Sequence, residues 1–159
     1  MKVLFLVRHG QSSWDDAALS DRERPLTEKG KRDAVKMGKR LAAADVAVDM
    51  ILSSPARRAR STARAIAKRL GFERKRIVLD ERLYAGAAAE LLAAVLEVAD
   101  DCRRVMLVGH NPELLELVQR LSGKDTNLPT CAVAELRFEV KAWAKIGRDR
   151  LEKLAIRYV

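Results

Sequence analysis

The chain has 159 residues, of which 48% are hydrophobic and 33% are charged, and its formal net charge at pH 7 is +9. This balance is typical of a globular protein with one core and excludes a disordered chain. No apolar run reaches the roughly 18 residues of a membrane helix. Only five apolar residues separate Lys2 from Arg8, too few for a secretion signal. We therefore expect a single domain over residues 1–159, located in the cytoplasm and without membrane contact.

The cysteines and the basic charge limit the possible partners. Cys102 and Cys131 lie far in sequence from each other and from both histidines, so neither a disulfide framework nor a zinc spacing is indicated. We expect no metal and no cofactor. The positive charge favours phosphate groups or nucleic acid as partner, although a solvated surface rich in Lys and Arg explains it equally well. An aromatic content of 4% argues against stacking on single-stranded bases.

Apolar runs typical of buried strands alternate with stretches of helical periodicity. The strand-like runs, in chain order, are VLFLV, VDMIL, RIVLD, RVMLVG, AVAELRFEV and LEKLAIRYV. Helical spacing occurs between the first five, over residues 27–41, 55–70, 87–98 and 112–121. This alternation predicts an α/β fold, a three-layer α/β/α sandwich around a mainly parallel central sheet. The last two runs have no helix between them, and we expect an antiparallel edge strand there.

Side chains able to do chemistry follow four of these strands. The first strand ends on Arg8 and His9, the second on Ser54, the third on Glu81 and the fourth on His110. The carboxyl ends of parallel strands share one edge of a sheet, where α/β proteins bind ligands. The chain has only two histidines, and both stand there beside a glycine. This placement predicts a functional site at that edge.

The stretch SSPARRARSTA predicts a helix start that carries unusual charges. With Ser54 as N-cap and Pro55 as first helical residue, Arg57, Arg58 and Arg60 fall in the first two turns. The helix dipole disfavours each cation there by a few tenths of a kcal/mol. A bound phosphate would compensate, because guanidinium groups and free helix N–H groups both bind its oxygens. The alternative is a basic surface helix.

Two further residues are candidates for substrate binding. In GHNPELLELV, Asn111 is the predicted N-cap of a helix that starts beside His110. In DRERPLT, Arg24 precedes a proline and so lies in an extended segment near the strand that carries His9. Arg24 is then either a solvated loop residue or a side chain that folds over the rim and contacts substrate.

These motifs together resemble the histidine phosphatase superfamily, which includes cofactor-dependent phosphoglycerate mutases and acid phosphatases. RHG matches the signature triplet of that family, SSPARRARSTA is similar to its S-S-x-L-x-R-A-x-x-T-A stretch, and GHN matches its second histidine motif. The RPLT sequence is most similar to the small bacterial phosphohistidine phosphatases of the SixA type. The resemblance implies a phosphoglycerate mutase-like fold and a phosphorylated substrate.

The resemblance also implies roles for individual residues. His9 would be the nucleophile that accepts the phosphoryl group, while Arg8 and Arg58 would hold its oxygens. His110 would add charge and hydrogen bonding, and Gly10 would let the backbone approach closely. These roles agree with chemistry, because an imidazole is a competent nucleophile at neutral pH and surrounding cations can replace a metal.

Departures from the family pattern concern the substrate. RHGQSSWDD is near the mutase form R-H-G-E-S-x-W-N, with Gln11 and Asp15 altered. Between Glu81 and His110 there is room for one helix, where mutases and larger phosphatases carry an insertion that shapes a lid, so we expect a small open site. LDERLYAG resembles the mutase stretch L-N-E-R-x-Y-G, which implies that Glu81 donates a proton; the alternative is a solvated glutamate.

The expected function is a metal-independent phosphatase that works through a covalent phosphohistidine intermediate, with protein phosphohistidine as substrate and inorganic phosphate as product. A small-molecule phosphomonoesterase or a mutase-like enzyme is the alternative of the same class. A basic nucleic-acid-binding module with two structural histidines is the alternative of another class. Basic residues on every predicted helix form no single stripe, so we do not expect nucleic acid as partner.

Overall fold

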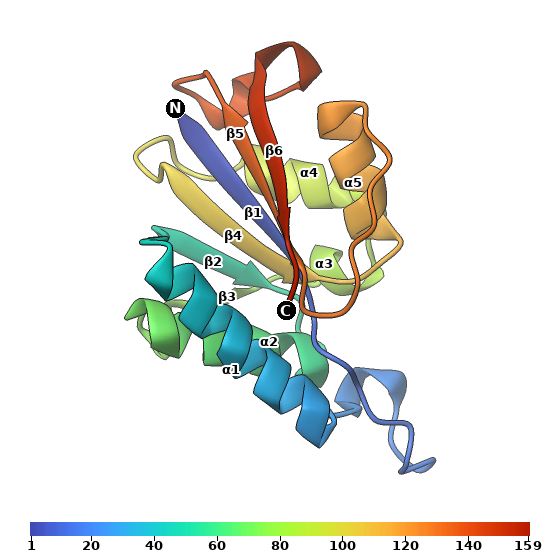
Figure 1. The fold of residues 1–159 in the computed structure, drawn as a ribbon. Helices are drawn as coiled ribbons and strands as arrows, with labels where there is room; N and C mark the ends of the chain where they lie inside the picture. Colours follow the sequence, from blue (N-terminus) through green and yellow to red (C-terminus); the bar gives the residue numbers. More distant parts are fainter.

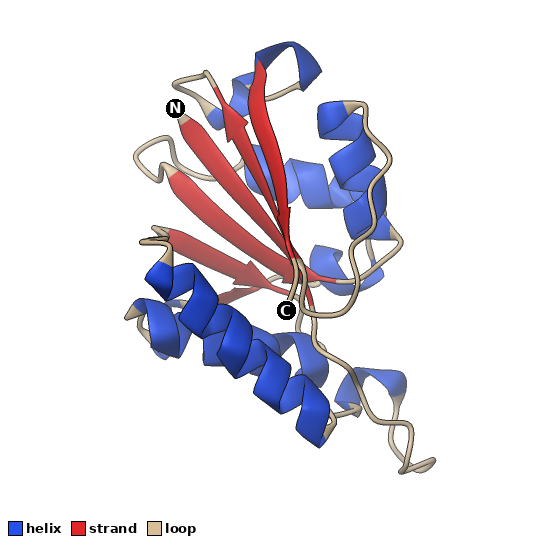
Figure 2. Ribbon diagram, viewed as in Figure 1, coloured by secondary structure: helices blue, strands red, loops and turns tan.

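The computed structural model describes residues 1–159 as one six-stranded sheet with helices on both faces (Figures 1 and 2). The strands are β1 (Lys2–Arg8), β2 (Met50–Ser53), β3 (Val78–Leu79), β4 (Arg104–Gly109), β5 (Val133–Phe138) and β6 (Leu151–Arg157). The α-helices are α1 (Glu28–Ala43), α2 (Arg57–Leu70), α3 (Arg82–Ala85), α4 (Ala88–Leu96) and α5 (Glu113–Ser122). The predicted three-layer α/β/α fold is confirmed.

The sheet has the order β3-β2-β4-β1-β5-β6, which places β1 and β4 at its centre. The first four strands along the chain run parallel, whereas β5 is antiparallel to both β1 and β6. The prediction of an antiparallel edge strand is confirmed by β6, which pairs only with β5. The carboxyl ends of β1, β2 and β4 therefore meet at one edge, near the point where the strands converge in Figure 1.

Two apolar layers enclose the sheet, because successive side chains of a strand point to opposite faces. Leu4 and Leu6 of β1 pack with α4 and α5, whereas Phe5 and Val7 pack with α1 and α2. Burial of such a side chain contributes about 1.5–3 kcal/mol. Central strands covered on both faces explain the continuous apolar runs of the sequence. The layer under α4 and α5 also holds the fully buried Trp143.

The predicted start of α2 is wrong by two residues. Ser54 is not its N-cap: the helix begins at Arg57, and the preceding Ala56 has extended backbone with ψ 137°. The Ser54 hydroxyl instead accepts a hydrogen bond from Ala56 N at 3.2 Å and lies 2.8 Å from His110 Nε2. The side chain expected to cap a helix is therefore engaged by the second histidine.

The predicted N-cap of α5 is also wrong. The helix begins at Glu113, and the Asn111 side chain donates to the Leu128 carbonyl at 2.9 Å rather than to the helix. This bond ties the end of β4 to the segment that leads into β5. The third strand differs as well: Val78 and Leu79 were expected to be buried but are exposed, because β3 is an edge strand that pairs only with β2.

Residues 11–27, called the arm below, connect β1 to α1 and project from the body of the molecule (Figure 1). The arm contains one 3-10 turn, Asp21–Glu23. Its base is closed by hydrogen bonds from Ser13 N to the Pro25 carbonyl at 2.8 Å and from Thr27 N to the Gln11 carbonyl at 2.9 Å. The arm thus starts and ends beside the carboxyl end of β1.

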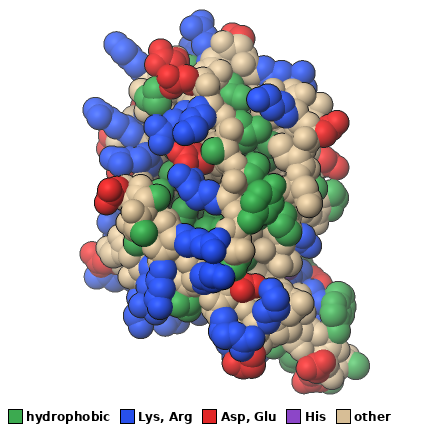
Figure 3. Space-filling model, viewed as in Figure 1, with side chains coloured by type: hydrophobic (Ala, Val, Ile, Leu, Met, Phe, Trp, Pro, Cys, Tyr) green, Lys and Arg blue, Asp and Glu red, His purple; other side chains and the backbone are tan.

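Lys and Arg side chains are spread over several elements of the face shown in Figure 3, with Asp and Glu among them. No helix of this structure combines the length and the apolar character needed to cross a membrane. The remaining 3-10 turns are Arg74–Arg76, Trp143–Lys145 and Arg148–Arg150.

Candidate active site

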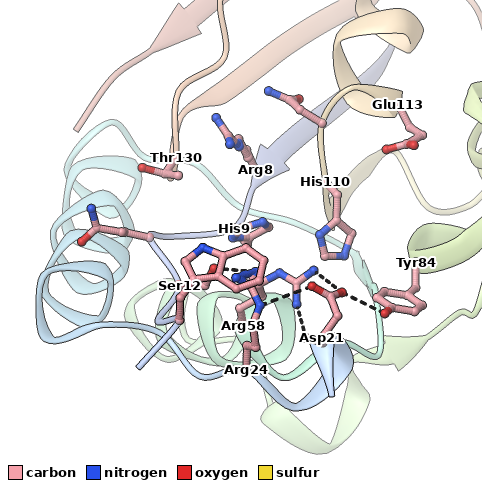
Figure 4. A pocket seen from close by; sticks show the side chains of 13 residues that line it. Arg8, His9, Ser12, Asp21, Arg24, Arg58, Tyr84, His110, Glu113 and Thr130 are labelled. Carbon is pink, nitrogen blue, oxygen red and sulfur yellow. Dashed lines mark hydrogen bonds and ion pairs between the residues drawn. The ribbon is translucent and has the colours of Figure 1, made fainter. Parts of the chain in front are cut away.

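The carboxyl ends of the parallel strands open into a polar cavity of about 620 Å³ (Figure 4). Its walls come from β1, the arm, α2, α3, the start of α5 and the segment before β5. The lining residues are Arg8, His9, Gln11, Ser12, Trp14, Asp21, Arg24, Arg58, Tyr84, His110, Asn111, Glu113 and Thr130. The structure therefore brings together His9, Arg8, Arg58, His110, Arg24 and Asn111, six of the residues singled out from the sequence.

His9 stands directly after β1 with 8% of its surface exposed. Its Nδ1 lies 2.6 Å from the Gly10 carbonyl oxygen, which can only accept, so Nδ1 carries the proton and Nε2 keeps a lone pair. Burial lowers the pKa of His9 to about 4; the bond to Gly10 opposes this shift, and the charges of Arg58, Arg8 and Arg24 add to it. At neutral pH the imidazole is thus uncharged, with one nitrogen available as a nucleophile.

Gly10 permits a close contact between the β1 end and α1. A Cβ on Gly10 would lie 2.9 Å from the Gly30 carbonyl oxygen, and a Cβ on Gly30 would lie 2.2 Å from the Gln11 carbonyl oxygen. The Gly10 amide donates to Thr62 Oγ1 on α2 at 3.0 Å. Gly10 does not line the cavity. The close approach made possible by this glycine is to the protein's own backbone.

Three arginines border the cavity from different elements. Arg8 ends β1, Arg24 lies in the arm and is 7% exposed, and Arg58 lies in the first turn of α2. The Nε groups of Arg8 and Arg58 and the Nη1 group of Arg24 are buried and make no hydrogen bond within the chain. Buried cationic donors are unfavourable without a partner. The arrangement therefore suits an oxyanion with several oxygens, which guanidinium groups bind strongly.

The structure separates the three arginines of SSPARRARSTA. Arg58 is buried and lines the cavity, whereas Arg57 is exposed on the other side of the same turn. Arg60 is half-buried and does not line the cavity. Only one of the three charges at this helix start can contact a ligand in the cavity.

His110 faces His9 across the site, with ring centroids 5.0 Å apart and planes at 57°. Its Nε2 lies 2.8 Å from Ser54 Oγ, and the edge of the Tyr84 ring packs against it. Burial lowers the pKa of His110 to about 3, with further lowering by His9 and Arg58 and an opposing effect of Asp21. Because the neighbouring cations oppose its protonation, an anion bound between the histidines would favour the protonated form.

Asp21 is a functional candidate that the sequence prediction missed. Its Oδ2 accepts hydrogen bonds from Arg58 Nη2 at 3.0 Å and from the Tyr84 hydroxyl at 2.9 Å (Figure 4). Its backbone carbonyl accepts from Arg58 Nη1 at 2.7 Å, and Oδ1 lies 3.3 Å from Arg24 Nε. No local pattern of the sequence indicates this position, because Asp21 reaches the cavity only through the fold of the arm.

Trp14 and Tyr84 also line the cavity without having been predicted. The Trp14 side chain is 76% exposed, and the guanidinium carbon of Arg24 lies 3.3 Å from its ring centroid, a cation–π contact. Tyr84 lies on α3, in the same LDERLYAG stretch that drew attention to Glu81. Both residues place an aromatic ring beside an arginine or histidine of the site.

Glu81 lies outside the cavity. Its side chain is 66% exposed and forms a two-pronged ion pair with Arg22, with Arg22 Nη1 donating to Oε2 at 2.9 Å. The hydrogen bond to Arg22 lowers the pKa of Glu81. A proton-donating role for Glu81 stays a prediction that this geometry does not favour. No group of three or more His, Cys, Asp or Glu side chains is arranged to hold a metal ion.

Comparisons with known proteins identify relatives of this chain. A family model described as the histidine phosphatase superfamily (branch 1) matches residues 4–85. An uncharacterised chloroplastic protein of Arabidopsis thaliana is 33% identical over 148 residues, which cover 88% of this chain and 68% of that protein. A 2,3-bisphosphoglycerate-dependent phosphoglycerate mutase of Bartonella quintana is 37% identical over 89 residues, covering 52% of this chain and 43% of the mutase.

Among solved structures, a protein of Nakamurella multipartitia assigned as the phosphohistidine phosphatase SixA matches with a TM-score of 0.85 at 27% identity. The match covers 99% of this chain and 95% of the other. The two proteins therefore share this fold over nearly their whole lengths. From the family model, the relatives and this structural match, the chain belongs to the histidine phosphatase superfamily, in its branch 1.

Proposed function

We propose that this protein is a metal-independent phosphatase that transfers the phosphoryl group of a protein phosphohistidine to His9 and then to water. The observation that carries the proposal is His9 itself, held neutral with a free Nε2 among three arginines. A phosphorylated substrate and phosphate as product are what the family implies.

In the first step the Nε2 lone pair of His9 attacks phosphorus, and the bond between phosphorus and the substrate's imidazole nitrogen breaks. The leaving nitrogen keeps the electron pair and takes a proton from solvent. In the second step a water oxygen bonds to phosphorus, the P–Nε2 bond breaks, and its electron pair returns to His9. One difficult displacement is thereby divided into two easier ones.

The cationic residues of the cavity can stabilise the phosphoryl group during its transfer. Arg8 and Arg58 can share the equatorial oxygens, and preformed donors of this kind are worth about 10²–10³-fold each in rate. Arg24 borders the same cavity and can bind the phosphate both before and during the transfer. His110, whose protonated form a bound anion favours, would supply a further donor opposite His9. With these groups already in place, a metal ion is not required to neutralise the phosphoryl charge.

A protein substrate is supported by what surrounds the cavity. Between Glu81 and His110 the chain forms only α3, α4 and β4; α3 contributes Tyr84 to the cavity wall, and α4 contributes no lining residue. The arm is the only projecting segment near the site, so a phosphorylated side chain on another protein can enter. The structural similarity to a protein assigned as a phosphohistidine phosphatase supports the same substrate class.

A mutase-like or small-molecule phosphatase activity is the second candidate. It is favoured by the 37% identity to a phosphoglycerate mutase over 89 residues, although that match covers 43% of the mutase. The cavity volume of about 620 Å³ is also sufficient for a small phosphorylated metabolite.

The deciding experiment compares kcat/KM of the purified protein on a phosphohistidine-bearing protein with that on a panel of metabolite phosphates, with and without EDTA. We expect a preference for the phosphoprotein, no effect of EDTA, and no turnover by His9→Ala. After an alkaline quench, acid-labile phosphate should be found on the wild type and not on His9→Ala. Higher kcat/KM on a metabolite would establish the second candidate, and loss of activity in EDTA would contradict the metal-independent mechanism.

A further inference from the structure

The cavity contains a carboxylate among its cations. Asp21 contacts Arg58 through both its side chain and its backbone carbonyl, and its side chain is 49% exposed. Glu113 also lines the cavity but makes no ion pair or side-chain hydrogen bond. Among the acidic side chains of this cavity, only Asp21 is bonded to an arginine that is placed to bind phosphate.

The two oxygens of Asp21 differ in their contacts. Oδ2 accepts hydrogen bonds from Arg58 and from the Tyr84 hydroxyl, and both bonds hold this oxygen in position. Oδ1 has only the longer 3.3 Å contact with Arg24 Nε. One oxygen is thus held in place, while the other retains capacity to accept from a water molecule in the cavity.

We propose that Asp21 is a catalytic residue that accepts the proton of the water which hydrolyses phospho-His9. This role rests on the proposed function and specifies its second step. It also differs from the role that the family resemblance assigned to Glu81, whose carboxylate lies outside the cavity and is held by Arg22.

The step balances without any further reactant. The water oxygen forms the new bond to phosphorus, the P–Nε2 bond breaks, and its electron pair returns to Nε2 of His9. The proton of the attacking water passes to Asp21 Oδ1 and is later released to solvent together with phosphate. Asp21 must be ionised beforehand. Burial acts to raise its pKa, but the hydrogen bonds from Tyr84 and Arg58 outweigh burial and leave the pKa below its ordinary value.

The negative charge of Asp21, which assists the second step, is unfavourable for the first step, the phosphorylation of His9. A carboxylate beside Arg58 opposes the approach of a phosphoryl dianion, so its removal should leave phosphorylation of His9 as fast as before or faster. Hydrolysis of phospho-His9 should become slower, because a positioned general base contributes about 10²–10⁴-fold. A residue that only positions Arg58 would slow both steps when it is removed.

The test follows both half-reactions in Asp21→Asn with radiolabelled phosphoramidate as donor and rapid quenching in alkali. We expect nearly every Asp21→Asn chain to carry label, and this label to decay at least about 10²-fold more slowly than in the wild type. Tungstate should inhibit Asp21→Asn at least as strongly as it inhibits the wild type. Glu23→Gln is the matched control, because it removes one negative charge from the same 3-10 turn. Glu23 is exposed and forms no ion pair, so this variant should behave as the wild type does. Added formate, which can replace the missing carboxylate, should restore hydrolysis of phospho-His9 in Asp21→Ala. This rescue tests the general-base role of Asp21 even if Asp21→Asn is less stable than the wild type.

Several outcomes would overturn the assignment. Parallel slowing of both half-reactions with weaker tungstate binding would make Asp21 a positioning residue for Arg58. Accumulation of phospho-His9 in Glu81→Gln rather than in Asp21→Asn would return the role to Glu81. Failure of the wild type itself to become labelled on His9 would remove the proposed function, and this role with it.

Discussion

His9 depends on two kinds of neighbour for its proposed reactivity. The Gly10 carbonyl fixes the tautomer by accepting the Nδ1 proton, while burial and three nearby arginines keep the ring uncharged. The cations that stabilise a phosphoryl group therefore also keep the nucleophile deprotonated. Once His9 carries the phosphoryl group, the same cations face its negative oxygens.

Arg57 and Arg58 allow a comparison of adjacent residues. Arg58→Ala should lower kcat by about 10²–10³-fold, the usual effect of removing an oxyanion donor, and should weaken inhibition by tungstate. Arg57→Ala should leave both quantities unchanged, because Arg57 is exposed outside the cavity. Steady-state kinetics with tungstate as competitor provide the measurement. Equal losses in the two variants would show that general positive charge, and not a specific contact, matters at this helix start.

Arg24 should act mainly on substrate binding. Its guanidinium is held by Ser12 Oγ at 2.9 Å and by the Trp14 ring at the cavity wall, so it can contact a phosphate before and during transfer alike. Arg24→Ala should raise KM with a smaller change in kcat, as loss of uniform binding does. Arg22→Ala is the control, because Arg22 lies two residues away in the arm but pairs with Glu81 outside the cavity. An unchanged KM in Arg24→Ala would make Arg24 a structural residue of the arm.

At the scale of elements, the arm is held in place by the start of α1. Thr27 caps the helix by accepting from Gly30 N at 3.0 Å, and its own amide bonds to the Gln11 carbonyl. Gly30 then brings the first turn of α1 against the chain that leaves His9. The position of Asp21 and Arg24 in the cavity therefore depends on this backbone contact.

Gly30→Ala should disturb that contact. The added Cβ would lie 2.2 Å from a backbone oxygen of Gln11, so the arm or the helix must move. Overpacking of this kind costs about 1–3 kcal/mol of unfolding free energy, and KM should rise because Arg24 shifts. Urea unfolding and kinetics measure the two effects. Gly147→Ala is the control, because the nearest atom to its added Cβ is a side-chain carboxylate oxygen of Asp149; it should change neither the stability nor KM. A Gly30→Ala variant with unchanged stability and unchanged KM would contradict this account.

The sequence predicts the elements that obey a simple periodicity and misses those placed by long-range contacts. The central strands and the four long helices follow from apolar spacing, and His9 and His110 follow from strand ends. Asp21 reaches the cavity only through the fold of the arm, which no local pattern specifies. Ser54 was misassigned as a helix cap because its partner, His110, lies 56 positions away in the chain.

On the scale of the whole molecule, the two buried neutral histidines couple stability to pH. Their pKa values in the folded chain are about 4 for His9 and about 3 for His110, against about 6.5 when unfolded. The unfolded chain therefore binds more protons as the pH falls below 6.5. The stabilising contribution is complete above that value and is lost as the pH falls to about 4 for His9 and to about 3 for His110.

The free energy of unfolding should decrease by about 2–3 kcal/mol between pH 7.5 and pH 5.5, about half from each histidine. Urea titrations at several pH values would measure this slope. In the double variant His9→Ala, His110→Ala the slope in this range should largely disappear, although overall stability will differ. A slope that persists in the double variant would place the coupling in other groups. Tungstate should reduce the slope in the wild type, because a bound anion favours protonated histidine.

The chain contains two tryptophans in opposite surroundings. Trp143 is fully buried beneath α4 and α5, whereas Trp14 is largely exposed at the cavity mouth against Arg24. Their fluorescence therefore reports on different events: Trp143 emission should shift to longer wavelength only on unfolding, whereas Trp14 emission should respond when an anion draws Arg24 away from its ring. With Trp14→Phe as the reference, the unmodified protein can serve as its own optical sensor of oxyanion binding.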